Sequence, residues 1–259
     1  MIPKVIHYCW FGHGKLPSDT KRYIETWKKY CPDYEIKEWN ESNFDIDCCK
    51  FVKQAYENSA WAFVSDYARL KIVYDNGGIY LDTDVELLKN LDFLLDNSFF
   101  ACVSQIGNLC ATGLGYGAEA GNPVVRKMME VYESMEFDPA RKNEIACPNI
   151  NDAIIKSLGY KLSDDVVDVN GMTILPPRYM DPLATGDSKT LLCDDTISIH
   201  HYSASWTSRG NKLKRKLINM VGLERVNKVK KLLRKNEEKD IRCCGTGTDS
   251  SAEKIIKHK

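Results

Sequence analysis

The sequence has no long apolar stretch, no regularly spaced cysteine pairs and no net charge. No apolar run approaches the roughly 18 residues that a membrane-spanning helix needs, so we expect no transmembrane segment. The opening residues, MIPKVIHYCWFG, lack the pattern of an export signal, and none of the ten cysteines belongs to a CxxC pair. This spacing argues against a structural zinc site. We expect a cytoplasmic protein with reduced cysteines.

The net charge of zero conceals two parts of opposite charge. Residues 1–208 carry 20 Lys and Arg against 30 Asp and Glu, whereas residues 209–259 carry 16 against 6. The acidic part is long enough to bury a core by itself. We expect one domain over 1–208, a basic amphipathic helical appendage over 209–239 and a disordered tail over 240–259.

Strand-like and helix-like segments alternate along the acidic part. A β-branched and aromatic run over 5–11 stops at glycines, and helical spacing follows over 18–30. This order of elements predicts an α/β domain with a largely parallel sheet. The same patterns predict further strands over 34–39, 79–81, 99–103, 173–175 and 196–199, and helices over 49–57, 59–75 and 123–135.

The sharpest local signal is the segment from Asn76 to Asp84, which reads NGGIYLDTD. Its glycines let the preceding helix end and the chain reverse tightly. The strand then ends at the carboxyl edge of the sheet, where open α/β folds bind ligands. In an extended chain, Tyr80, Asp82 and Asp84 point to one side. The two carboxylates indicate either a site for a hard divalent cation or a solvated acidic turn.

Asp66 and Arg69 precede this segment in a predicted helix with an apolar stripe. Their spacing of three residues puts them on one helix face, where they can pair. One interpretation is an ordinary surface ion pair. The other is that the two side chains face a polar ligand, to which Arg69 donates hydrogen bonds and from which Asp66 accepts them.

A histidine–tryptophan segment, ISIHHYSASW over 197–206, closes the acidic part. A neutral imidazole of His200 or His201 at a strand end can complete a metal site that carboxylates begin. Trp206 can cover a ligand with a flat apolar face. The alternative is that the histidines end an ordinary strand and that Trp206 packs in the core.

A glycine-rich stretch, TGLGYG over 112–117, lies between these segments. Its spacing does not fit the GxGxxG pattern of a dinucleotide site. It can border a ligand pocket, since glycine lets a ligand approach the backbone closely, or it can be a plain loop.

Taken together, IPKVIHYCWFG, SDYARLKIVYDNGGIYLDTDVEL and IHHYSASW resemble the DXD-motif sugar transferases of glycosyltransferase family 32. That family includes yeast Och-type mannosyltransferases and bacterial capsular polysaccharide and lipopolysaccharide enzymes. It is distantly similar to the glucosylating domain of the large clostridial toxins. The resemblance implies a GT-A fold, a UDP- or GDP-sugar donor, a Mn²⁺ or Mg²⁺ ion, and retention of the anomeric configuration.

The resemblance also implies roles for residues around the donor. Trp10 matches the aromatic residue that stacks on the nucleotide base, and Tyr80 stands where an aromatic residue flanks the nucleoside. Ser65, Asp66 and Arg69 match residues around the donor sugar.

For the metal, the resemblance implies Asp84 as a direct ligand and Asp82 as a carboxylate facing the ribose and sugar, with contact to the ion through water. A further ligand comes from the late histidine segment. The toxins use a carboxylate and a serine there, so the choice between His200 and His201 stays open, and we favour His200. The same loop offers two further donor contacts, Ser205 and Trp206.

We therefore expect a retaining, metal-dependent hexosyltransferase that acts on a glycan or lipid-linked oligosaccharide acceptor in surface polysaccharide synthesis. One alternative is a phosphohydrolase with Asp82 as nucleophile, although that pattern wants Thr or Val where Glu86 stands. Another is a non-catalytic metal- or nucleotide-binding module.

The basic segment 209–239 has two interpretations. Cationic amphipathic helices bind anionic membrane surfaces, which would place the protein peripherally on the inner face of the cell membrane. Alternatively, the segment docks on the acidic domain. No recognition motif accompanies the basic residues, so we expect no nucleic-acid partner.

Overall fold

The computed structural model describes residues 1–142, 144–183 and 190–203. Ser205, Trp206, the predicted appendage 209–239 and the predicted tail 240–259 lie outside these residues. None of the helices described is long and apolar enough to cross a membrane.

The described residues form helices and strands in alternation, which confirms the predicted α/β class. The helices are α1 (Ser18–Tyr30), α2 (Lys50–Glu57), α3 (Trp61–Asn76), α4 (Pro123–Glu133) and α5 (Cys147–Ser157), with short 3₁₀ turns at Asp92–Leu94 and Pro139–Arg141. The strands are β1 (Val5–Cys9), β2 (Glu35–Trp39), β3 (Gly78–Tyr80), β4 (Val85–Leu87), β5 (Phe99–Cys102), β6 (Tyr116–Ala118), β7 (Val167–Val169), β8 (Met172–Leu175) and β9 (Ser198–His200).

Seven strands form one mixed sheet in the order β2-β1-β3-β6-β5-β8-β7, and β4 pairs with β9 in a small second sheet. β1 is parallel to β2 and β3, and β5 is parallel to β8. However, β6 is antiparallel to β3 and β5, and β7 is antiparallel to β8. The prediction of a largely parallel sheet is therefore wrong. It failed because β6 and β7 are only three residues long, and β6 lies in the glycine-rich stretch.

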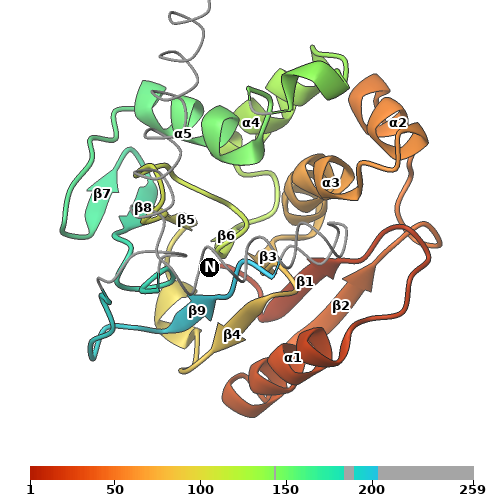
Figure 1. Ribbon diagram of the computed structural model, residues 1–259. Helices are drawn as coiled ribbons and strands as arrows, with labels where there is room; N and C mark the ends of the chain where they lie inside the picture. Colours follow the sequence, from red (N-terminus) through yellow and green to blue (C-terminus); the bar gives the residue numbers. More distant parts are fainter. Residues whose placement is uncertain (143, 184–189, 204–259) are drawn as a thin grey trace, which may run out of the picture.

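Different elements cover the two faces of the large sheet (Figure 1). Helices α2, α3, α4 and α5 pack on one face, whereas α1 packs with β4 on the other. Side chains of β3 and the residue after it alternate between the two cores: Ile79 and Leu81 enter the core under α1, and Tyr80 enters the core under α3. Burial on both faces explains why the strands read as nearly continuous apolar runs.

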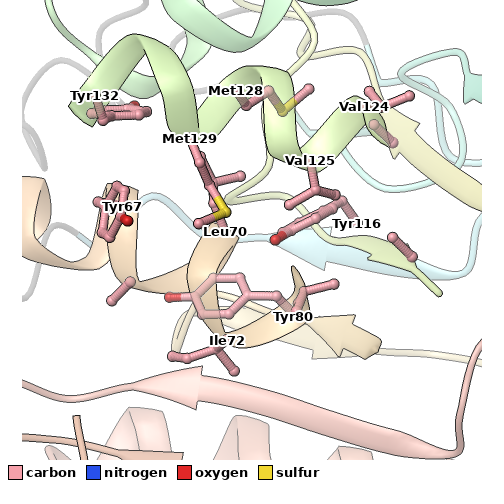
Figure 2. Packing of buried hydrophobic residues seen from close by; sticks show 14 of the residues in the cluster. Tyr67, Leu70, Ile72, Tyr80, Tyr116, Val124, Val125, Met128, Met129 and Tyr132 are labelled. Carbon is pink, nitrogen blue, oxygen red and sulfur yellow. The ribbon is translucent and has the colours of Figure 1, made fainter. Parts of the chain in front are cut away.

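The core under α3 and α4 is aromatic where it borders β3. Tyr80 and Tyr116, on neighbouring strands, have ring centroids 6.3 Å apart. Figure 2 shows both rings below α4, with Val125 and Met129 above them. The Tyr116 hydroxyl donates a hydrogen bond of 2.8 Å to the carbonyl of Arg69. The core therefore fixes the turn of α3 that carries Arg69.

The Gly77–Gly78 pair ends α3 directly against β1. Gly78 has a φ of +108°, which side-chain-bearing residues rarely adopt. A Cβ at Gly78 would also lie 2.8 Å from Nε2 of His7. Nδ1 of His7 accepts from the indole of Trp39 at 3.1 Å, so Nε2 carries the proton and donates to the Gly77 carbonyl at 2.9 Å. This pairing holds the imidazole in its neutral form.

Burial of His7 makes the stability of the fold depend on pH, because it lowers the pKa of His7 from 6.5 to about 4. Between these values the unfolded chain binds a proton that the folded protein does not, so stability falls as the pH falls from 6.5 towards 4. Between pH 7 and pH 5 we expect the urea-unfolding free energy of the wild type to fall by about 2 kcal/mol more than that of His7→Gln, whose amide does not titrate. Equal losses in both proteins would contradict this assignment.

Candidate metal and donor site

Asp82 and Asp84 lie in a turn between β3 and β4. The amide of Val85 donates to the carbonyl of Asp82 at 3.0 Å and closes this turn, and the Asp82 amide donates to the Gly113 carbonyl at 3.3 Å. The extended chain predicted as far as Asp84 is therefore wrong, because β3 ends at Tyr80. The two carboxylates converge through the turn and through their contacts with a later segment.

That later segment is β9, which pairs with β4 so that His200 lies opposite Val85. The His201 amide donates to the Asp84 carbonyl at 2.9 Å, and the Ser203 amide donates to Asp84 Oδ2 at 2.7 Å. As a result, Nε2 of His200 lies 3.1 Å from Asp84 Oδ1 and 4.0 Å from Asp82 Oδ2. The pairing thus brings the late histidine segment onto the acidic turn.

Helix α1 packs against the two-stranded sheet of β4 and β9. The indole of Trp27 donates to the Val85 carbonyl at 2.8 Å, and the amide of Leu87 donates to the Thr26 hydroxyl at 3.0 Å. These two bonds fix both ends of β4 to one helix. The position of Asp84 is therefore set by α1 as well as by the sheet.

Asp82, Asp84 and His200 form the one cluster of three potential metal ligands found among the residues that the structure describes. One ligand atom from each lies within 4.8 Å of the others. Two carboxylate oxygens and an imidazole nitrogen suit Mn²⁺ and are compatible with Mg²⁺. The charges also fit, since three carboxylates (Asp66, Asp82 and Asp84) surround one guanidinium and one imidazole.

The two histidines of this segment point to different sides. The His201 ring stacks on Tyr23 of α1, with ring centroids 4.6 Å apart, and its Nε2 lies 2.7 Å from Glu86 Oε2. Alternation along a strand explains the difference, because neighbouring side chains face opposite sides. Of the two candidates, only His200 is in the carboxylate cluster.

The close pairing of these groups shifts their pKa values. Burial alone would raise the pKa of Asp84, but the charge of His200 and hydrogen bonds from His200 and Ser203 hold it below its ordinary value. Burial would lower the pKa of His200, yet Asp84 and Asp82 outweigh it and raise that pKa. A protonated His200 would therefore form an ion pair with Asp84, whose Oδ1 lies 3.1 Å from its Nε2. Because a metal ligand must be a neutral imidazole, a bound cation would compete with this proton.

Arg69 lies in the interior beside the metal-ligand cluster and is only 5% exposed. Its Nη2 is 3.1 Å from Asp66 Oδ1 and 3.2 Å from Asp82 Oδ1. Its guanidinium lies 4.9 Å from the ring centroid of Tyr80, whose hydroxyl donates to Asp82 Oδ1 at 3.1 Å. The interpretation of Asp66 and Arg69 as a surface ion pair is therefore wrong. Burial raises the pKa of Asp66 to about 6, against the opposing charge of Arg69.

Ser65 supports Arg69 from within α3. The Ser65 carbonyl accepts from Arg69 Nε at 3.1 Å, and the Ser65 hydroxyl donates to the Trp61 carbonyl at 3.0 Å. The hydroxyl that the resemblance places near the donor sugar thus bonds to its own helix in this structure.

Trp10 lies outside this cluster, directly after β1. It lines a pocket of about 410 Å³ with six other residues. Because β1, β2 and β3 are parallel, this pocket and the acidic turn lie at the same edge of the sheet. The other lining residues are His13, Gly14, Glu38, Asn40, Glu41 and Ser42.

Sequence reasoning missed Ser203 and Gly113 as parts of the site. Ser203 contributes through its backbone amide, for which no side-chain pattern exists. Gly113 lies so close to Asp82 that a Cβ there would be 2.3 Å from Asp82 Oδ2. The glycine-rich stretch could be recognised in the sequence, but its contact with Asp82 could not.

Two solved glycosyltransferase structures show some likeness to this fold. One is a glycosyltransferase involved in the glycosylation of the major capsid of PBCV-1, with 12% identity and a TM-score of 0.45, covering 85% of this chain and 100% of that chain. The other is the galactosyltransferase LgtC in complex with donor and acceptor sugar analogs, with 12% identity and a TM-score of 0.43, covering 84% of this chain and 94% of that chain.

Sequence comparison identifies the region that contains the acidic turn. A protein of Acanthamoeba polyphaga mimivirus, named as the uncharacterized glycosyltransferase L373, is 26% identical over 226 residues, which cover 80% of this chain and 84% of that protein. Residues 17–101, which include α3, Asp82 and Asp84, match the family described as the glycosyltransferase sugar-binding region containing the DXD motif. The chain is therefore a glycosyltransferase of the DXD-motif type.

Proposed function

We propose that the protein is a retaining, divalent-metal-dependent hexosyltransferase. It moves a hexose from a UDP- or GDP-sugar to a hydroxyl of a glycan or lipid-linked oligosaccharide. The observation that carries this proposal is the convergence of Asp82, Asp84 and His200 within 4.8 Å at the carboxyl edge of the sheet. We place the reaction in the synthesis of a surface polysaccharide, either capsular polysaccharide or lipopolysaccharide, in line with the family resemblance.

The proposed metal ligands are Asp84 and His200, with Asp82 reaching the ion directly or through water. A Mn²⁺ or Mg²⁺ ion bound there supplies positive charge next to the donor diphosphate. His201 takes no part, since it bonds to Glu86 on the other side of β9. Attachment to an anionic membrane through the segment 209–239 stays a prediction, because that segment lies outside the described residues.

Arg69 and its two carboxylates are proposed to bind the donor sugar. Because both carboxylates are already in place around a buried guanidinium, they can accept hydrogen bonds from sugar hydroxyls without reorganising. The fixed charge of Arg69 also opposes the negative charge that develops on the departing phosphate. Ser65 holds Arg69 in this orientation through its carbonyl.

We propose retention on the basis of the family resemblance, and the pairing of these carboxylates bears on how retention is achieved. Asp66 and Asp82 are both paired with Arg69, which weakens either carboxylate as a covalent nucleophile. We therefore propose that the acceptor hydroxyl attacks the anomeric carbon from the face that the phosphate leaves. The new bond joins the acceptor oxygen to the anomeric carbon, the bond to the phosphate oxygen breaks, and that oxygen takes the hydroxyl proton. The pairing of Asp82 also disfavours the phosphohydrolase alternative, which requires Asp82 to attack phosphorus.

The pocket beside Trp10 is the proposed site of the nucleotide base. An indole face gives a flat apolar surface on which a base can stack. The pocket and the acidic turn share one edge of the sheet, so a nucleotide lying along that edge can contact both.

We expect Asp84→Ala to lower Mn²⁺-dependent release of nucleoside diphosphate from the donor by at least about 1000-fold, because the ion would lose a direct ligand. Glu86→Ala is the matched control, since Glu86 is a carboxylate two residues further along the chain, on β4, and contacts His201. The measurement is coupled release of UDP or GDP from a panel of sugar donors. Near-normal turnover in folded Asp84→Ala would rule out this site.

The two histidines should differ in their effect on Mn²⁺ binding. His200→Ala should weaken Mn²⁺ binding by at least about tenfold, because it removes a ligand, whereas His201→Ala should leave the affinity unchanged and lower only thermal stability. Titration of Mn²⁺ by electron paramagnetic resonance measures both variants. A larger loss of affinity in His201→Ala than in His200→Ala would show that the wrong histidine has been assigned.

Gly113 lies so close to Asp82 that a larger residue there should disturb the site. A Cβ at Gly113 would lie 2.3 Å from Asp82 Oδ2 and 3.0 Å from Arg69 Nη1, so Gly113→Ala must displace these side chains. A displacement of about 1 Å can lower a rate by about 100-fold, and we expect a loss of that order in donor turnover. The φ of Gly113 is not in the left-handed region, so the melting temperature should change little. Full activity in the variant would contradict the predicted clash.

A further inference from the structure

Asp181 is a carboxylate in the core next to the β9 segment and is 0% exposed. Its Oδ2 accepts three hydrogen bonds: from the Tyr202 hydroxyl at 2.7 Å, from the Gln105 amide at 2.8 Å and from the Ser104 hydroxyl at 3.1 Å. Its own amide donates to the Pro177 carbonyl at 2.8 Å. The carboxylate is therefore held in one orientation by groups from two separate segments, residues 104–105 and Tyr202. Neither the DXD motif nor the proposed donor contacts use it.

Tyr202 connects this carboxylate to the metal-ligand cluster. Its backbone has a φ of +49°, which is unusual for a bulky side chain and must be maintained by its contacts. The Tyr202 ring meets the His200 ring edge to face, with centroids 4.1 Å apart and an interplanar angle of 83°. The hydroxyl is fixed by Asp181 and the ring lies against His200, so a shift of one moves the other.

The other ring nitrogen of His200, Nδ1, shows why the contact between His200 and Tyr202 matters. Metal-bound histidines usually donate their other ring N–H to a carboxylate, carbonyl or water, which fixes the ring. Nδ1 of His200 is buried and has no hydrogen-bond partner among the described residues. Among the described residues, none orients this ring through Nδ1, and the packed edge of Tyr202 is a contact that can do so.

We propose that Asp181 and Tyr202 are positioning residues for the metal ligand His200. Asp181 fixes the Tyr202 hydroxyl, and the Tyr202 ring holds the His200 imidazole at the angle at which Nε2 faces Asp84 and Asp82. This inference rests on the proposed function, because it assumes that His200 binds the cation.

The test compares Tyr202→Phe with Tyr34→Phe in the full-length protein. Tyr34 also donates to a carboxylate, Asp92, at 2.9 Å, and it lies away from the metal-ligand cluster. We expect Tyr202→Phe to raise the Mn²⁺ dissociation constant, measured by electron paramagnetic resonance without donor, by about tenfold. Tyr34→Phe should stay within twofold of the wild type, although each variant loses one tyrosine–carboxylate bond and some thermal stability.

A second variant tests whether the two residues act in series. Asp181→Asn should weaken Mn²⁺ binding in the same direction, and the double variant should lose no more affinity than the weaker-binding single variant. Unchanged Mn²⁺ affinity in Tyr202→Phe, or additive losses in the double variant, would overturn the positioning role while leaving the metal site intact. A wild type that binds no Mn²⁺ would instead overturn the proposed metal site, and the positioning role with it.

Discussion

The short pairing of β4 with β9 is the interaction on which the site depends. It sets His200 opposite Val85 and lets the backbone of β9 and the residues after it bond to both the carbonyl and the carboxylate of Asp84. Without it, the DXD turn would be a pair of carboxylates with no third ligand. Helix α1 supports this pairing through Trp27 and Thr26, so a helix remote from the chemistry determines where the ligands lie.

The charges of the buried side chains explain why the groups around the site are closely paired. Asp66, Asp82 and Asp84 place three carboxylates in or near the interior, and among the described residues Arg69 and His200 offset them. Buried charges are tolerated when they are paired and hydrogen-bonded. Arg69 meets this requirement for two carboxylates, and His200 meets it for the third until a cation takes its place. The proposed sugar-binding and metal-binding roles thus share one network.

Much of this arrangement was predictable from local patterns. The glycine pair before β3, the DXD residues and the apolar strands predicted the edge of the sheet at which the candidate cluster lies. The family resemblance also brought the late histidine segment to the DXD residues, and the structure has His200 there. Other contacts between distant segments were not predicted. The turn at Asp82, the burial of Arg69 and the partner of Gly113 depend on segments whose spacing carries no signal. Strand alternation in ISIHH puts the two histidines on opposite sides, but which of them faces the carboxylates follows only once the partner strand is known.

The most direct test of the account is the position of the metal. Crystals of the protein grown with Mn²⁺ and a nucleoside diphosphate, measured at the manganese absorption edge, locate the ion by its anomalous scattering. We expect one peak bounded by Asp84, His200 and Asp82, with the diphosphate completing the coordination. A peak whose ligands leave out His200, or an ion bound elsewhere on the chain, would contradict the claim that the β4–β9 pairing assembles the catalytic centre.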